Sequence, residues 1–209
     1  MRNQIYSFSR LAFIKKNSKA LKKKGRRVNI PFLWIVTDEQ RAPDPTKIIE
    51  KFPKNQNIGI IFRHYKSKYR RDIAEELSKL CKLRNYLFFV AEDLNLATKV
   101  NASGVHLPRW SKPKRINRRF LTSTTLHSKN EIRNVISSKP SIVFVSPVYS
   151  TKSHPEKPPL GPIRAALLAK QIQFGSLSIA LGGITLYDAK RLRSLGFFGI
   201  ASTFSDFGK

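Results

Sequence analysis

Short runs of apolar residues, separated by segments long enough for a helix, recur along the chain from Pro31 onwards. Continuous apolar runs, rather than alternating ones, are typical of parallel strands that are covered on both faces. The pattern predicts eight strands, at residues 32–37, 58–62, 86–90, 104–107, 120–124, 142–145 and 178–181 and in the run that begins at Gly199. Residues 69–84 give the clearest amphipathic helix between two of these strands.

Eight strand–helix units predict an α/β fold, a short (β/α)8 TIM barrel, with a doubly wound open sheet as the alternative. We expect a single barrel domain over residues 29–209 with a truncated last helix. Residues 1–28 form a basic N-terminal extension, either a disordered arm or a helix packed on the domain. We hypothesise that this extension covers Phe198 and Phe204 in place of the missing helix.

The charge balance changes this picture, because 40 Lys and Arg face 13 Asp and Glu, a net charge of +27. Such a surface attracts phosphates and nucleic acids, so nonspecific nucleic-acid contact is expected alongside an anionic substrate. The single cysteine excludes an intramolecular disulfide. No apolar run approaches the roughly 20 residues that span a bilayer, which predicts a cytoplasmic protein without a membrane partner. An oligomer is left open.

One turn carries the first chemical signal. Gly182 and Gly183 follow an apolar strand and precede a helix-like segment, a context in which exposed backbone N–H groups bind phosphate. In a barrel the chemistry gathers at the carboxyl ends of the strands. Those positions are rich in cationic, hydroxyl and glycine groups, with two carboxylates, Asp38 and Glu92. This favours binding of phosphorylated compounds over hydrolysis by paired carboxylates.

Five segments, in order and at barrel spacing, resemble thiamine phosphate synthase and its TenI-like relatives. They are Leu33–Asp38, the Gly-Val-His-Leu strand at 104–107, the turn at 125–128, the loop at 146–153 and the Ala-Leu-Gly-Gly-Ile turn at 180–184. The resemblance runs from about Leu33 to Phe204. It implies a (β/α)8 fold and a transferase of thiamine biosynthesis.

The resemblance also implies a reaction. A thiazole phosphate nitrogen attacks an aminopyrimidine methyl diphosphate, and pyrophosphate leaves. In such enzymes Mg²⁺ and cationic side chains stabilise the departing diphosphate. This chemistry needs charge stabilisation and positioning rather than a protein nucleophile.

Site residues follow from the same resemblance. Phosphate binding is implied for Gly182, Gly183, Ser202 and Thr203. Contact with the diphosphate or the substrate is implied for Thr125, Thr151, Ser153 and His154. The implied catalytic groups are Arg63, Lys66 and His127, and the implied metal ligand is Glu92.

The chain also departs from the family pattern. The second-strand motif keeps only Arg63, with Lys66 one place beyond its usual position, and Ser111 stands where a second metal-binding Asp is usual. A hard divalent cation normally takes more carboxylate than Glu92 alone provides. Two readings therefore stay open: a transferase that makes thiamine phosphate, or a divergent TenI-like protein with a degraded metal and diphosphate site. The second would be non-catalytic or would act on another phosphorylated heterocycle.

Overall fold

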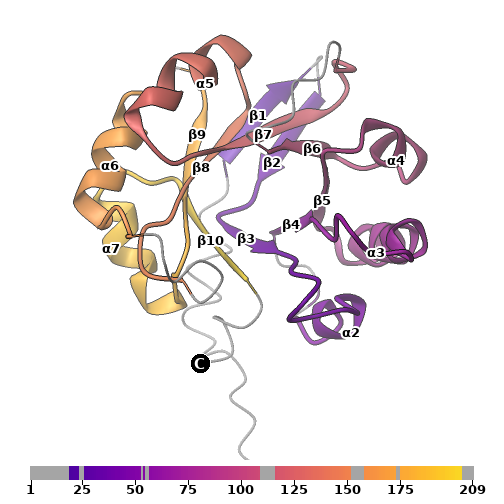
Figure 1. Ribbon diagram of the computed structural model, residues 1–209. Coiled ribbons are helices and arrows are strands. Elements are labelled where there is room, and N and C mark those ends of the chain that lie inside the picture. Colours follow the sequence, from indigo (N-terminus) through magenta and orange to yellow (C-terminus); the bar gives the residue numbers. More distant parts are fainter. Residues whose placement is uncertain are drawn as a thin grey trace, which may run out of the picture.

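The computed structural model describes residues 19–23, 26–52, 54, 57–108, 116–151, 158–172 and 175–203. Within them, eight parallel strands close into a barrel in the order β10-β3-β4-β5-β6-β7-β8-β9 (Figure 1). The strands are β3 (Leu33–Val36), β4 (Ile58–Phe62), β5 (Leu87–Ala91), β6 (Gly104–Leu107), β7 (Leu121–Leu126), β8 (Ile142–Val145), β9 (Leu177–Leu181) and β10 (Gly199–Thr203). The predicted closed barrel is confirmed, and the open-sheet alternative is wrong.

Helices lie around the outside of the barrel (Figure 1). They are α2 (Thr46–Ile49), α3 (Arg70–Arg84), α4 (Leu94–Lys99), α5 (Ile132–Ser138), α6 (Pro162–Lys170) and α7 (Ala189–Ser194), with short 3-10 turns η1 (Lys129–Glu131) and η2 (Leu186–Asp188). Helix α3 buries Ala74, Leu77 and Cys81, the apolar face that its sequence predicts. None of the helices in the described part of the chain is long and apolar enough to cross a membrane.

Side chains on each strand alternate between two apolar clusters. Trp34 and Val36 belong to the cluster inside the barrel, whereas Leu33 and Ile35 belong to the cluster beneath the helices. The Trp34 ring lies edge-on to Phe89 and Phe144, with centroids 5.0 and 5.6 Å away. A Cβ at position 59 would lie 2.3 Å from Trp34, so Gly59 makes room for this ring at the barrel centre.

The N-terminal extension is a hairpin where the structure describes it. Strands β1 (Lys19–Lys23) and β2 (Arg26–Ile30) pair antiparallel, and β2 leads into the start of β3 (Figure 1). The helix that we considered for this segment is therefore wrong for the described residues. A strand suits it because alternate residues, Leu21 and Val28 among them, pack against the interior cluster.

The hairpin covers the N-terminal end of the barrel, and Phe198 packs against the same interior cluster. The hairpin closes the end of the barrel and does not replace an outer helix, and coverage of Phe198 by this extension stays a prediction. Phe204 and the expected truncated last helix lie outside the described residues. The carboxyl ends of the strands lie at the opposite end of the barrel, which is called the mouth below.

Candidate active site

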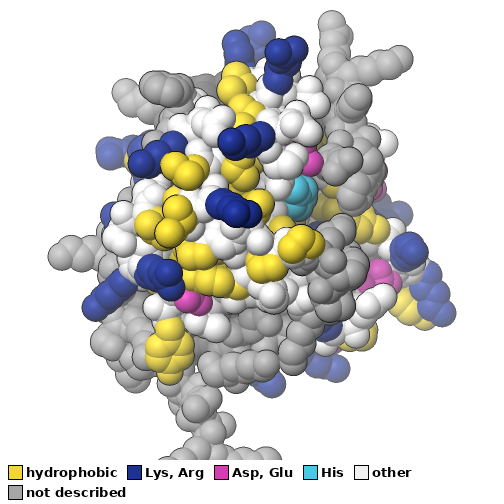
Figure 2. All heavy atoms as spheres, turned by 60° about the vertical axis from the view of Figure 1, so that its left-hand side comes forward, with side chains coloured by type: hydrophobic (Ala, Val, Ile, Leu, Met, Phe, Trp, Pro, Cys, Tyr) yellow, Lys and Arg dark blue, Asp and Glu magenta, His cyan; other side chains and the backbone are white. Residues whose placement is uncertain are grey.

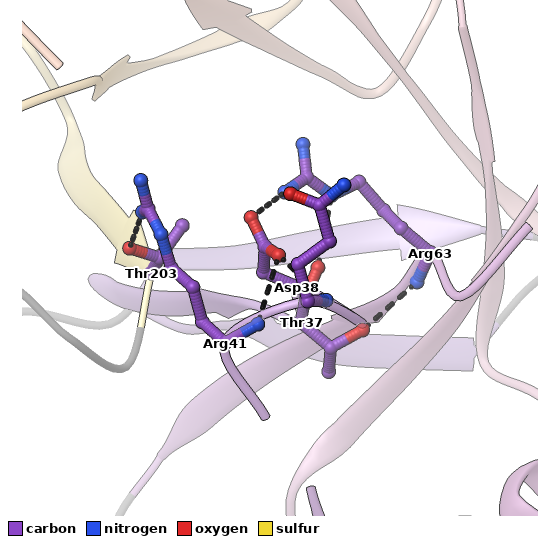
Figure 3. A network of polar contacts seen from close by, with 6 residues as sticks. Thr37, Asp38, Arg41, Arg63 and Thr203 are labelled. Carbon is purple, nitrogen blue, oxygen red and sulfur yellow. Dashed lines mark hydrogen bonds and ion pairs between the residues drawn. The ribbon is translucent and has the colours of Figure 1, made fainter. Parts of the chain in front are cut away.

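A carboxylate and an arginine from neighbouring strands meet at the mouth of the barrel (Figure 3). Asp38 follows β3, and one of its carboxylate oxygens lies 3.6 Å from Nη2 of Arg63, which follows β4. Its other oxygen accepts backbone N–H bonds from Gln40 at 3.1 Å and from Arg41 at 3.4 Å. These bonds fix the carboxylate beside the arginine.

Arg63 is held by β3 through both its backbone and its side chain. The Arg63 N–H donates to Thr37 Oγ1 at 3.0 Å, and Nε donates to the Thr37 carbonyl at 2.9 Å. About a third of the side chain, 34%, stays exposed. A guanidinium has five N–H donors, so this one can still donate to an anion in the mouth.

Two further arginines surround this pair. Arg41 donates to Thr203 Oγ1 at 3.3 Å, which links β10 to the loop after β3 (Figure 3). Arg70, the first residue of α3, donates to the carbonyls of Arg63 and Ala91, the second at 2.7 Å. Arg70 thus ties together the carboxyl ends of β4 and β5 and fixes the backbone of Arg63.

The glycine turn after β9 presents backbone donors at the same end. Gly182 and Gly183 have φ values of +100° and +63°, a region that glycine adopts without strain. Within the described part of the chain, the N–H groups of Gly182, Gly183 and Ile184 have no hydrogen-bond partner. Three successive N–H donors of this kind form a seat for an anion.

Neighbouring loops hold this turn in place. Tyr149 N–H donates to the Gly182 carbonyl at 3.0 Å, and a Cβ at position 183 would lie 2.4 Å from the Ser150 carbonyl oxygen. The methyl group of Thr151 would lie 3.2 Å from a Cβ at position 182, so Thr151 adjoins the turn. Only glycine fits at Gly183 without displacing the loop.

The helix after the turn is capped. The Asp188 carboxylate accepts hydrogen bonds from both the backbone N–H and the hydroxyl of Thr185, each at 2.9 Å. Such a capping box satisfies donors at the start of a helix. The cap fixes the chain directly after Ile184 and so limits the orientations of the three N–H groups.

Two histidines line the interior below the mouth. His127 Nδ1 lies 2.7 Å from the Ser146 carbonyl, which can only accept, so Nδ1 carries the proton and Nε2 of the neutral ring is an acceptor. His106 is buried, with Nδ1 3.0 Å from Ser123 Oγ. Burial, and to a lesser degree the nearby Arg63 and His127, lowers the pKa of His106 to about 3. His106 is therefore neutral at physiological pH.

The remaining expected site residues are placed less uniformly. Thr125 pairs in register with the interior residue Phe144, so its side chain lies on the interior face of β7. Ser202 pairs with Ile35, which faces the helices, and its side chain is buried on that side rather than in the mouth. Lys66 is exposed in the turn after β4. Ser153 and His154 lie outside the described residues.

The described residues do not assemble a divalent-cation site. They contain no group of three or more His, Cys, Asp or Glu side chains placed to hold a metal ion. Glu92 is exposed, Asp93 accepts the Leu96 N–H as the cap of α4, and Asp38 is paired with Arg63. The carboxylates near the mouth are thus dispersed, and the Mg²⁺ that the family resemblance implies has no built site among them.

A hollow elsewhere on the surface is unrelated to the mouth. It encloses about 540 Å³ between α5 and the end of α6, and Ile132, Ile136 and Arg133 contribute to its walls. Figure 2 shows this side, where hydrophobic and cationic side chains are interspersed. Its place on the outer helices separates it from the residues at the strand ends.

Sequence reasoning gave no role to Asp38, Arg41 or Arg70. The position of Asp38 directly after a strand was visible, but its pairing with Arg63 joins residues of two different strand–helix units. Arg41 and Arg70 lie among many other cationic residues, so no local signal distinguished them.

The fold and its mouth define a short (β/α)8 barrel with polar groups at the carboxyl ends of its strands, the arrangement found in barrel enzymes. The chain belongs to the thiamine monophosphate synthase family, whose model matches residues 33–204. This membership bears out the family resemblance and the expectation of a transferase-type enzyme.

Individual relatives agree with the family. A protein of Aquifex aeolicus, named provisionally as thiamine-phosphate synthase 2, is 28% identical over 83% of this chain and 96% of its own length. Thiamine-phosphate synthase of Synechococcus is 28% identical over 78% of this chain but only 49% of its own length. The chain thus spans about half of several relatives that it matches.

The fold is shared with solved structures. Thiamine phosphate pyrophosphorylase from Pyrococcus furiosus gives a TM-score of 0.71 at 21% identity, over 85% of this chain and 87% of that one. The corresponding protein from Bacteroides thetaiotaomicron gives a TM-score of 0.55 at 21% identity, over 83% of each chain. At such identities the likeness concerns the barrel alone.

Proposed function

We propose that this protein joins an aminopyrimidine methyl diphosphate to a thiazole phosphate and releases pyrophosphate, as a transferase of thiamine biosynthesis. The thiazole nitrogen forms a bond to the methylene carbon, the bond from that carbon to the diphosphate oxygen breaks, and pyrophosphate leaves with the electron pair. The observation that carries this proposal is the turn at Gly182–Ile184, whose three N–H groups have no hydrogen-bond partner among the described residues and which lies at the same end of the barrel as Arg63.

The glycine turn would hold the thiazole phosphate. Backbone N–H groups of Gly182 and Gly183 would donate to the phosphate oxygens, with the hydroxyl of Thr151 beside them. Gly183 cannot carry a side chain without displacing the loop at Ser150, so this loop holds the turn in its conformation.

The arginines would hold the diphosphate. Arg63 keeps part of its guanidinium exposed, and Arg70 holds the backbone of Arg63 in place. Charge-assisted bonds from a guanidinium to a phosphate group are among the stronger hydrogen bonds in proteins. Negative charge on the leaving pyrophosphate would be stabilised in this way.

His127 would orient the pyrimidine. Because its Nδ1–H is committed to the Ser146 carbonyl, Nε2 is available to accept a hydrogen bond from a ligand N–H or O–H. Thr125, two residues earlier on the same face of the strand, adds a hydroxyl at this level of the barrel. Fixed groups of this kind favour a productive arrangement of the two substrates.

The test is to mix the purified protein with both precursors and Mg²⁺ and to measure thiamine phosphate by chromatography. We expect product to form in proportion to protein and to be lost in Arg63→Ala. If calorimetry detects binding of neither precursor, the proposal is wrong.

A second candidate follows from the dispersed carboxylates. The absence of a metal-binding group among the described side chains favours a divergent TenI-like protein that binds a phosphorylated heterocycle without joining it to a diphosphate. Thiazole phosphate binding in calorimetry without any thiamine phosphate formation would select this candidate over the synthase.

A further inference from the structure

The carboxylates of the described chain are concentrated towards the mouth. Helices in a barrel run from the carboxyl ends of the strands back to their amino ends. Glu50 is the one described carboxylate that follows the end of a helix. The others lie in strand-to-helix connections, in η1 or η2, or in the first half of α3.

The opposite end of the barrel carries cations instead. Lys82 and Arg84 in α3, Lys99 in α4 and Arg193 in α7 each lie in the last turn of a helix. Cations at helix C-termini are favourable because of the helix dipole, so helix stability alone explains these positions. Helix stability does not explain the cations of the hairpin, because the hairpin contains no helix and comes before α2 in the chain.

The hairpin concentrates positive charge at this end. Its backbone register pairs Lys22 with Arg27 and Lys23 with Arg26. The register therefore brings four cationic residues together at the turn end of the hairpin. Lys19 and Arg27 are the hairpin cations whose side chains the structure describes; both are exposed, and none of the recorded ion pairs includes either of them. A polyanion bound at this end of the barrel would supply negative charge that these cations attract.

We propose that the hairpin β1–β2 and the adjacent N-terminal end of the barrel bind the phosphate backbone of nucleic acid without sequence preference. The phosphates of nucleic acid supply a dense line of negative charge, which exposed Lys and Arg side chains such as Lys19 and Arg27 neutralise. Leu21 and Val28 pack against the barrel interior and are unavailable for insertion into a bilayer, which favours nucleic acid over a membrane surface.

This surface lies at the end of the barrel opposite the mouth, so it binds independently of the proposed reaction. Nucleic acid and thiazole phosphate should occupy the protein together without competition. If the test of either proposal fails, the other proposal is unaffected, because the hairpin surface and the mouth use separate residues.

The test compares two charge-reversal variants of the full chain with equal net charge. Lys19→Glu with Arg27→Glu changes the hairpin, and Lys129→Glu with Lys190→Glu changes exposed positions at the mouth-side starts of helical segments. The probe is a fluorescein-labelled DNA duplex of about two helical turns, followed by anisotropy between about 50 and 200 mM salt. An RNA duplex of equal length distinguishes the two nucleic acids.

We expect the hairpin variant to weaken duplex binding by about tenfold or more and to lower the salt slope by about 2. The mouth-side variant should change binding by less than about twofold at the same melting temperature. Equal weakening by both variants would overturn the proposal in favour of unlocalised charge. Binding to vesicles of phosphatidylserine and phosphatidylcholine without binding to either duplex would also overturn it, in favour of a membrane surface.

Discussion

The two sides of the barrel mouth are built from different materials. At β9 the proposed anion seat consists of backbone N–H groups on a turn that two glycines, a neighbouring loop and a capped helix hold in place. At β3 to β5 the polar groups are side chains, and Asp38, Arg63 and Arg70 largely satisfy one another or nearby carbonyls.

The difference shows why one side keeps the family pattern and the other departs from it. A seat of backbone amides needs only the two glycines and the path of the chain, so substitutions elsewhere leave it intact. A metal and diphosphate site needs several specific carboxylates and cations at once. Arg63 remains here, but Glu92 and Ser111 stand where the family resemblance calls for metal-binding Asp residues.

The largest expected effect is from Gly183→Ala. Its methyl group would meet the Ser150 carbonyl at 2.4 Å, and φ would stay at +63°. We expect thiazole phosphate binding, measured by calorimetry, to fall by at least tenfold, and unfolding to become easier by about 1–3 kcal/mol.

Gly161→Ala is the matched control, because Gly161 also has a positive φ, +74°, while its Cβ would meet no atom within 4 Å. It should show a stability cost of about 1–3 kcal/mol with unchanged ligand affinity. Equal affinity in Gly183→Ala and the wild type would remove the seat from the glycine turn.

The next largest effect concerns the side-chain half of the mouth, which Asp38, Arg63 and Arg70 form. Arg63→Ala should weaken diphosphate binding by about tenfold to a hundredfold, since a charge-assisted bond contributes about 1.5–3 kcal/mol. Thiazole phosphate affinity should be unaffected, because that ligand uses the other half of the mouth. Calorimetry with each compound separately measures both.

Asp38→Asn should change diphosphate affinity in the opposite direction to Arg63→Ala. It removes the carboxylate that lies 3.6 Å from Arg63 while keeping the shape of the side chain. We expect diphosphate to bind a few-fold more tightly, because the guanidinium no longer shares its charge with a protein anion. Weaker binding would mean that Asp38 is needed to position Arg63.

His106 lies below both halves of the mouth, and we expect it to make the stability of the protein depend on pH. Its pKa is lowered to about 3 in the folded protein, against about 6.5 when unfolded. Between these values only the unfolded chain takes up the proton, so stability falls as the pH falls from about 6.5 towards about 3, by at most about 1.4 kcal/mol per pH unit.

Urea unfolding across this range should show a flatter pH dependence in His106→Gln than in the wild type. Asn130→Gln, at an exposed position, should keep the wild-type slope. An NMR titration of the ring protons in the wild type checks the same pKa without a substitution. A normal titration near pH 6.5 would contradict the burial of this histidine.

The smallest expected effect is from Glu92→Gln. Because no described carboxylate cluster surrounds Glu92, we expect diphosphate affinity in the presence of Mg²⁺ to change by less than about twofold. A large loss of diphosphate affinity that appears only with Mg²⁺ would show that Glu92 binds the ion. The side-chain half of the mouth would then contain a metal site.

Local patterns predicted most of the strands and the glycine turn. The runs at 58–62 and 104–107 coincide with β4 and β6, because a continuous apolar run between turn residues has few other folded states. The hairpin at 19–30 was missed, since its few apolar residues are diluted by lysine and arginine and only the barrel end that they cover makes them a strand.

By itself, the sequence determined an eight-stranded barrel with a glycine turn after the seventh barrel strand, since apolar periodicity and glycine act over a few neighbouring residues. Only the tertiary structure decided that Arg63 faces Asp38, that the Ser202 side chain is buried beneath the helices, and that most described carboxylates lie towards the mouth. These features depend on the register and closure of the barrel, which bring together residues far apart in the chain.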